Sequence, residues 1–414
     1  TFTTTIISSP EVRNNLQTFV VKSEEQNTKD ILIKTLLYPQ YTIGERVTLS
    51  GVVSSRKSSY PHHKVRSFDY SSYLHARYIG SEMYYPSIRV EDDDTHFSKY
   101  MLGAWKESLE DRLAQFIGEP ASSLSLGMLF GTSSLSGEVK EWFKVSGLSH
   151  ITVLSGFNIA IVIAFALFIF RPLPLFLRVS LTVTFVIGFV VAVGGEASVV
   201  RATLMSLVAL LALLLGRSYV AKQALAISFL CIILYDPFLL LHDISLHLSF
   251  LATAGIVYLG DFFIKNVESS FSFFMWKYFS EVLGTSIAAY LATVPYLMYT
   301  FGSVSLYALF ANILVLPFVS VTMLLSFLTI VCSFVSDTLA AISGVLASLF
   351  LDGIIFVAKM ISFLPYASLS FSLTLCEMFF CYFLLFLLML FLVKGKSETC
   401  VTKQGEILTD IIYY

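Results

Sequence analysis

The chain has 414 residues, a net charge of −2, 56% hydrophobic residues and only 14% charged residues. Soluble globular chains carry about 25% charged residues, so this composition excludes a soluble enzyme, a disordered chain and a secreted disulfide scaffold, and it indicates a polytopic membrane protein. The balanced charge provides no overall attraction for nucleic acid, although local patches remain open. The five cysteines show no metal-ligand spacing, so we expect no disulfide framework, no metal site and no cofactor.

Residues 1–94 form the polar part of the chain. The first 120 residues hold 14 of the 27 Lys and Arg and 15 of the 29 Asp and Glu. Short β-rich runs alternate with turn residues, with Gly44 at a turn, and the runs are 18–22, 31–37, 47–53 and 81–90. This spacing favours a small OB-like β-barrel, and a generic β-sandwich is the alternative.

Residues 95–150 are predicted to contain amphipathic, interfacial helices. Apolar residues recur at helical spacing over 96–118, and Lys, Glu and Asp occupy the other positions. The apolar positions are Phe97, Met101, Ala104, Trp105, Leu109, Leu113 and Phe116. We expect this helix to lie on the membrane surface, or alternatively to pack on the barrel.

Residues 151–394 contain nine apolar runs, and a bilayer crossing needs about 20 residues. The predicted transmembrane helices are 151–170, 176–193, 199–216, 223–241, 244–260, 282–300, 304–333, 339–364 and 369–393, and a tail over 395–414 follows. Pro237, Pro295 and Pro317 predict broken helices. Irregular backbone within a membrane is tolerated where it is buried in protein or lines a water-filled cavity.

Basic residues gather at alternate connections between these runs: Arg171, Arg178, Arg217, Lys222, Lys265, Lys277, Lys394 and Lys396. The connections near 194–198, 302–303 and 365–366 contain no Lys or Arg. The positive-inside rule therefore places the basic connections and the C-terminus in the cytoplasm and the N-terminal domain outside. We predict a multi-pass protein of the cytoplasmic (inner) membrane.

Several polar residues interrupt the apolar runs: His150, Asn158, Glu196, Arg201, Asp243, His247, Asn312, Asp352 and Lys359. Ionisable groups are costly in hydrocarbon and usually face a bundle interior or a wet path. Asp243 and His247 are four residues apart and are expected to share a helix face. As alternatives, Glu196 and Asp243 sit at the outer interface, His247 is satisfied by an interhelical hydrogen bond, and Lys359 reaches the helix end. Together with broken helices, these residues indicate a channel or transporter.

The sequence contains no catalytic motif of the GxxxxGK[ST], HExxH or GxSxG type. Ser149, His150 and Ser155 are close in sequence, but adjacent residues on a helix do not face each other. We therefore expect no enzymatic activity from this chain.

Five segments, taken in chain order, resemble blocks of the ComEC competence family. Segment 67–85 contains SFDYSSYL, 127–162 contains GLSHITVLSGFN, 199–241 carries an Arg and a DP dipeptide, 242–260 contains HLSF, and 286–320 contains Pro, Phe-Gly, Asn and Pro in that order. Family members import single-stranded DNA across the cytoplasmic membrane during natural transformation. The resemblance therefore implies an inner-membrane DNA channel.

The polar residues and the resemblance together give one set of predicted channel-lining residues: His150, Ser155, Gly156, Asn158, Arg201, Asp243, His247, Tyr290 and Asn312. Three positions depart from the family pattern. Asn158 replaces a His, and His247 and Tyr290 each replace a Gln. All three keep a hydrogen-bonding or aromatic group, so a polar path is retained.

Many ComEC relatives carry an additional metallo-β-lactamase-like domain that is proposed to degrade one strand. This sequence has no HxHxDH pattern, so we expect a truncated form, with any strand-degrading step done by a separate nuclease or by a part missing from this sequence. The resemblance implies further partners beside single-stranded DNA and membrane lipid, namely an outer DNA receptor and a cytoplasmic helicase-like ATPase.

Cations and aromatic rings interleave in the polar domain. Proteins that hold single strands without sequence preference combine cationic grooves with stacking aromatics. We predict DNA contacts from Arg56, Lys57, Tyr60, Lys64, Arg66, Phe68, Tyr70 and Tyr73; the alternative is a solvated loop with ordinary core aromatics. Two other functions stay open for the whole chain: a small-solute or lipid transporter, and a membrane-anchored assembly protein.

Overall fold

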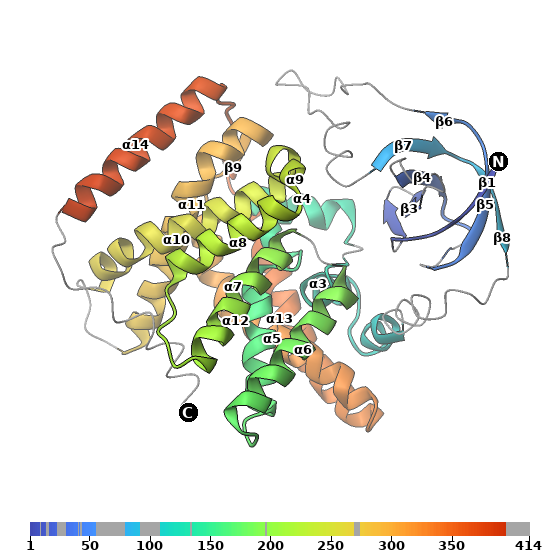
Figure 1. The fold of residues 1–414 in the computed structure, drawn as a ribbon, viewed down its shortest axis with the longest axis horizontal. Coiled ribbons are helices and arrows are strands. Elements are labelled where there is room, and N and C mark those ends of the chain that lie inside the picture. The colour runs from blue at the N-terminus through green and yellow to red at the C-terminus, as the bar shows by residue number, and fades with distance from the viewer. Residues whose placement is uncertain are drawn as a thin grey trace. The chain divides into compact units, whose positions relative to one another are not determined.

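The computed structural model describes residues 1–8, 10–13, 16–22, 30–39, 41, 44–54, 79–91, 108–132, 135–194, 197–268 and 274–394. The chain divides into two compact units. One comprises Thr1–Gln115 with Pro237–Asp243, and the other comprises Phe116–Asp236 with Ile244–Tyr414. The first unit contains strands β1–β8, and the second contains nearly all of the apolar helices (Figure 1).

The described strands of the first unit form two sheets. One has the order β1-β5-β8 and the other has the order β2-β3-β4-β7-β6, with β4 and β7 parallel. The strands are β1 (Phe2–Thr5), β2 (Glu11–Arg13), β3 (Leu16–Val21), β4 (Asp30–Leu36), β5 (Arg46–Ser50), β6 (Val53–Ser54), β7 (Ile79–Tyr84) and β8 (Ser87–Glu91).

Both sheets contribute to one hydrophobic core. Along β3 every second residue is buried, as the alternating pattern requires, so Phe19 and Val21 point inward. They meet Leu49 of β5 and Met83 of β7 in the same cluster. The described strands thus pack as two sheets around a shared core and form no closed barrel, so the OB-type closure stays a prediction.

The predicted turn at Gly44 is confirmed, because Gly44 has a φ of 93° two residues before β5 begins. The β-rich run predicted over 81–90 forms two strands, β7 and β8. Tyr85 adopts a φ of 49° and Pro86 follows it, so the chain leaves one sheet after β7 and enters the other at β8. A proline cannot donate to a strand ladder, which explains the break.

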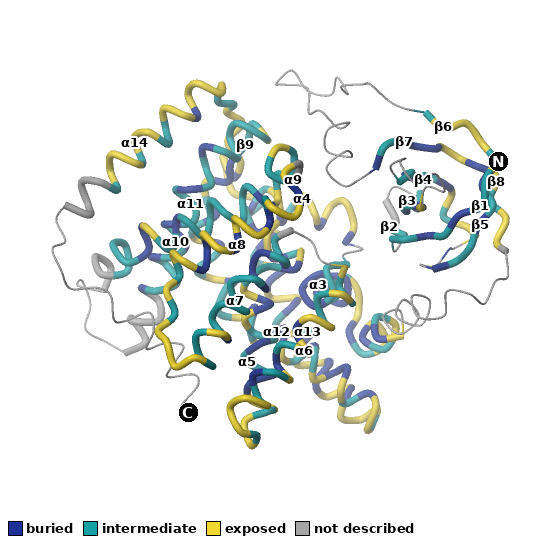
Figure 2. The backbone as a smooth tube through the Cα atoms, in the orientation of Figure 1, coloured by how far each residue is buried: buried dark blue, intermediate teal, exposed yellow. Residues whose placement is uncertain are grey.

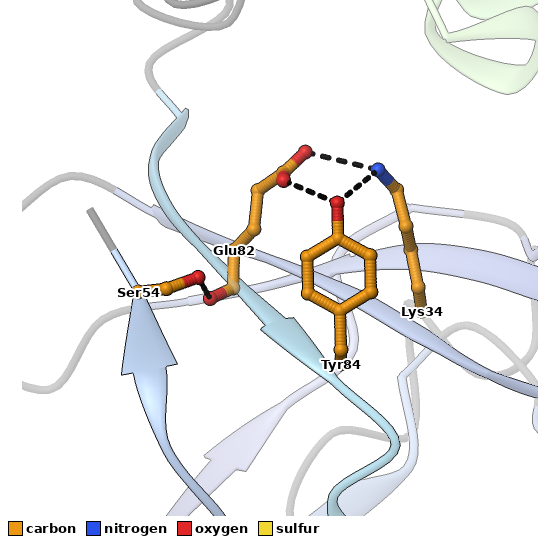
Figure 3. A network of polar contacts seen from close by, with 4 residues as sticks. All are labelled: Lys34, Ser54, Glu82 and Tyr84. Atoms are coloured by element: carbon orange, nitrogen blue, oxygen red, sulfur yellow. Dashed lines mark hydrogen bonds and ion pairs between the residues drawn. The ribbon is translucent and has the colours of Figure 1, made fainter. Parts of the chain in front are cut away.

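A buried carboxylate ties β4 to β7. Glu82 is 2% exposed and accepts hydrogen bonds from Lys34 Nζ at 3.0 Å and from Tyr84 Oη at 2.7 Å, while Ser54 Oγ donates to the Glu82 backbone carbonyl at 3.1 Å (Figure 3). A buried charge is tolerated when it is paired and hydrogen-bonded, as here. This network is structural and fixes the register of β4 against β7.

Part of the predicted amphipathic helix is described, as a helix over 108–116. Leu109, Leu113 and Ile117 are buried at successive i, i+4 positions. The amphipathic pattern is therefore confirmed for this segment, and residues 92–107 lie outside the part of the chain that the structure describes.

The helical unit begins with two short helices that precede the long apolar ones. The helices are α3 (Ala121–Phe130), α4 (Gly137–Ser146), α5 (Gly156–Ile169), α6 (Leu175–Val193), α7 (Ala197–Leu214), α8 (Ala221–Tyr235), α10 (Ile244–Glu268), α11 (Phe274–Phe301), α12 (Ala308–Ser333), α13 (Asp337–Ser362) and α14 (Leu375–Lys394). A one-turn 3₁₀ helix, η2 (Ser149–Ile151), precedes α5, and α9 (Pro237–His242) belongs to the first unit.

Within the described residues, six helices are long and apolar enough to cross a membrane: Ser149–Ile169, Leu175–Val193, Ile244–Ile264, Ser280–Phe301, Ala308–Ser333 and Asp337–Ser362. The other three predicted spans correspond to the shorter apolar helices α7, α8 and α14. Exposed residues follow much of α14 and the outer side of α13 (Figure 2). Many of them are large apolar side chains, such as Phe383 and Leu349, which is typical of lipid-facing helices.

Two of the three predicted helix breaks are wrong. Pro295 lies inside α11 and Pro317 lies inside α12, because transmembrane helices tolerate proline where neighbouring groups satisfy the freed carbonyl. Pro237 behaves as predicted: α8 ends at Tyr235 and the proline opens the next helix, α9.

Small residues allow the closest helix contacts. A Cβ on Gly255 of α10 would lie 2.5 Å from the carbonyl oxygen of Ala288 in α11, and a Cβ on Gly284 would lie 2.7 Å from Ile264. Helices in membranes commonly approach each other at such positions. Elsewhere in the unit, α12 contacts α13, and strand β9 (Ser303–Ser305) pairs with β10 (Ser368–Ser370).

Candidate functional site

The start of α5 is the centre of the candidate site. Ser155 occupies the N-cap position, but its side chain makes no cap hydrogen bond. Its hydroxyl instead pairs with Asn158 Oδ1 at 3.1 Å. The backbone N–H groups of Gly156 and Phe157 donate to no described residue. Such first-turn N–H groups carry the positive end of the helix dipole.

Asn158 joins two helix ends. It is 2% exposed, and its Nδ2 donates to the carbonyl oxygen of Met128 at 3.0 Å. Met128 lies in the last turn of α3, where helix carbonyls have no partner within the helix. The amide therefore satisfies the C-terminus of α3 and also contacts Ser155 at the N-terminus of α5.

Arg201 on α7 is turned into the helical unit and is only 7% exposed. Its Nε donates to Ser249 Oγ at 2.8 Å and its Nη1 lies 3.3 Å from Met205 Sδ. The guanidinium carbon lies 5.8 Å from the centre of the Phe250 ring, which is a cation–π distance. Among the described residues no carboxylate forms an ion pair with it.

Arg201 and Gly156 are brought together by the contact between α5 and α7. A Cβ on Gly156 would lie 3.0 Å from Arg201 Nη2 and 3.2 Å from Ala202 Cβ. A side chain at this position would be crowded by Arg201 and Ala202, and backbone strain plays no part, because Gly156 does not have a positive φ. The guanidinium therefore lies against the N-terminus of α5.

His247 faces another way. Its Nδ1 lies 2.5 Å from Tyr296 Oη of α11, with the two rings edge to face at 5.3 Å. Successive residues on a helix are rotated by about 100°, so His247 and Ser249 project from nearly opposite sides of α10. One side contacts Tyr296 and the other contacts Arg201. The alternative prediction of an interhelical hydrogen bond for His247 is confirmed.

The remaining predicted lining residues make separate contacts. Tyr290 Oη donates to the carbonyl of Ser305 in β9. Asn312 Oδ1 is buried and has no hydrogen-bond partner within the described part of the chain. His150 is exposed in η2. Asp243 lies one residue before α10 and falls in the other unit, so it is not on the helix that carries His247.

The structure therefore places two groups of predicted residues together: Gly156 with Arg201, and Ser155 with Asn158. The eight predicted DNA-binding residues all fall within 55–78, which the structure does not describe. Glu196 also lies outside the described residues, because 195–196 are not described. Whether any of these residues lines a channel stays a prediction.

Two partners of Arg201 were not predicted. Ser249 and Phe250 are the last two letters of the HLSF block in which only His247 was selected. A helical projection of that block places Ser249 on the opposite side from His247, and this was the available signal.

Comparison with known proteins gives two findings. The family model described as "Competence protein" matches residues 128–395, which include α5, α7 and α10. "ComE operon protein 3" of Bacillus subtilis (strain 168) is 23% identical over 255 residues, covering 61% of this chain and 31% of that protein. The alignment thus spans about a third of the relative's length. No solved structure matches the chain significantly.

Proposed function

Because the chain belongs to the Competence protein family, we propose that it forms the passage by which single-stranded DNA crosses the cytoplasmic membrane during natural transformation. The relative of Bacillus subtilis bears the name of a competence operon, which supports a role in DNA uptake. Conduction of a strand through this chain is our inference from the helical unit.

The inward-facing Arg201 is the observation that carries the proposal. A cation in a membrane helix is expensive and marks an ion or substrate path when it faces the bundle interior. Arg201 is held by a hydroxyl, a thioether and an aromatic ring, all of them neutral. A polyanion passing through the unit would meet a single buried cation at Arg201, which would attract it without binding it tightly enough to prevent release.

We further propose nine membrane crossings, with α7, α8 and α14 spanning together with the six longer helices. The distribution of Lys and Arg supports an N-terminal domain outside the cell and a cytoplasmic C-terminus. The N-terminal domain would bind the incoming DNA strand as OB-type domains do, through residues 56–73.

The chain is proposed to act as a conduit and not as an enzyme. An outer DNA receptor would deliver the strand and a cytoplasmic ATPase would supply directionality, and the second strand would be degraded by another protein or by a part missing from this sequence. The resemblance to the family suggests the receptor and the ATPase, and each of these partners is open to a direct test.

The test is uptake of labelled DNA by a deletion strain. Cells without the protein are expected to bind DNA at the surface and to accumulate no nuclease-protected DNA, while a plasmid copy restores uptake. Normal uptake by the deletion strain would refute the proposal. In liposomes that contain the purified chain, flux of small solutes without passage of single strands would favour the alternative, a small-solute or lipid transporter.

A further inference from the structure

Two positive features meet at the start of α5. One is the guanidinium of Arg201, whose Nη2 lies 3.0 Å from the position of a Cβ on Gly156. The other is the N-terminus of a 14-residue helix, which carries about half a positive charge. Like charges in a poorly solvated place repel each other, so this juxtaposition is favourable only when an anion neutralises both.

Within the described residues, the guanidinium has unused hydrogen-bond donors. An arginine carries five N–H donors, and the described structure uses Nε for Ser249 and Nη1 for Met205, a weak acceptor. Nη2 makes no hydrogen bond to a described residue, although Arg201 is only 7% exposed. A buried charged donor without an acceptor is costly unless a ligand supplies one.

The N-terminus of α5 also has backbone N–H donors that bond to no described residue. In α4 the N-cap Ser136 accepts a hydrogen bond from the backbone N–H of Val139. In α5 the equivalent Ser155 does not cap, because its hydroxyl pairs with Asn158. The N–H groups of Gly156 and Phe157 therefore stay available beside Arg201.

We propose that Arg201 Nη2 and the first backbone N–H groups of α5 form a binding site for one phosphodiester oxyanion. The proposal rests on the proposed function, since the phosphodiester would belong to the DNA strand in passage. Helix N-termini bind phosphate through such N–H groups, and arginine is well suited to phosphate oxygens. Gly156 keeps the space beside the guanidinium open, because a Cβ there would lie 3.0 Å from Arg201 Nη2.

The experiment measures binding of dimethyl phosphate, a phosphodiester mimic, to the full chain in nanodiscs of neutral phosphatidylcholine, using phosphorus NMR line broadening. We expect saturable binding by the wild type and at least about a tenfold weaker affinity in Arg201→Gln, because charged hydrogen bonds contribute roughly that much. Arg201→Lys should bind at an intermediate level, since it keeps the charge and loses the fork.

Gly156→Ala tests the geometry without changing any charge. Its Cβ would displace Nη2 and should weaken binding to a similar extent. The matched control is Gly137→Ala, at the first residue of α4 after a serine N-cap, where a Cβ meets nothing within 4 Å. This control should bind as the wild type does. Full binding by Gly156→Ala, or by folded Arg201→Gln, would overturn the site.

Two further arms separate the sources of phosphate and of counter-ion. A short oligothymidylate should compete with dimethyl phosphate; competition by phosphatidylglycerol nanodiscs alone would overturn the assignment to a strand and indicate a lipid headgroup. If dimethyl phosphate binds only to Glu196→Gln and not to the wild type, the proposal of a free oxyanion site is overturned. The Glu196 carboxylate would then be the counter-ion of Arg201. Absence of binding with uptake defective in the deletion strain refutes this site and leaves the proposed function standing.

Discussion

Replacing Asn158 with leucine removes the amide that joins the ends of α3 and α5. The substitution keeps the volume and deletes the 3.0 Å hydrogen bond to the Met128 carbonyl. That carbonyl lies in the last turn of α3 and becomes an unsatisfied buried acceptor, since the site is 2% exposed. Leaving such a group unpaired costs about 1–3 kcal/mol.

The assay is thermal unfolding of the detergent-solubilised chain. A destabilisation of 1 kcal/mol lowers Tm by about 2–4 °C in proteins of about 150–250 residues, so a loss of 1–3 kcal/mol corresponds to a fall of about 2–12 °C for Asn158→Leu. Asn158→His, the residue that the family pattern has here, keeps a ring N–H donor and should recover most of the loss. Ser155→Ala removes only the 3.1 Å contact with Oδ1 and should cost less.

Two results would refute this reasoning. One is a wild-type Tm for folded Asn158→Leu, which would mean that the Met128 carbonyl needs no partner. The other is a Ser155→Ala variant as unstable as Asn158→Leu, which would move the important contact to the hydroxyl.

Three further predictions concern the packing of each unit. Gly255→Ala places a Cβ 2.5 Å from the Ala288 carbonyl oxygen and should destabilise the α10–α11 pair by about 1–3 kcal/mol in thermal unfolding. The control Gly260→Ala, whose Cβ has its nearest neighbour at 3.7 Å, should keep the wild-type stability. Equal stabilities of the two variants would contradict the contact. Glu82→Ala leaves Lys34 without its carboxylate and should raise hydrogen exchange in β4 and β7 of the full chain, and unchanged protection would argue against the network. His247→Leu loses the hydrogen bond to Tyr296 and should cost about 1 kcal/mol, while His247→Gln should retain most of it; a Gln variant as unstable as the Leu variant would exclude that bond as the cause.

The sequence predicted the membrane class and the position of the long helices, because composition and run length depend on local content alone. It also predicted that Arg201 would face the interior, since the cost of a charge in lipid applies in any fold. The partners of Arg201 could not be predicted in the same way. Ser249 and Phe250 lie 48 and 49 residues away along the chain, and their contact depends on how α7 meets α10.

Other differences arise from tertiary context. Pro295 and Pro317 read as breaks because proline disrupts an isolated helix, yet both lie within continuous helices. Asn158 was predicted to line the channel from its polar character. Its hydrogen bond to the Met128 carbonyl could not be predicted, because Met128 lies on α3, a segment too short to span the membrane. The β-rich run over 81–90 contains Pro86, which signals a break, but the change of sheet between β7 and β8 depends on tertiary pairing.

The most direct test of the central claim is DNA uptake by cells in which Arg201 is replaced with glutamine, normalised to the amount of inserted protein. If this buried cation lies on the route of the strand, nuclease-protected DNA should fall by about tenfold or more, the equivalent of one charged hydrogen bond, and Arg201→Lys should restore part of it. Uptake equal to wild type by a stably inserted Arg201→Gln protein would contradict the account.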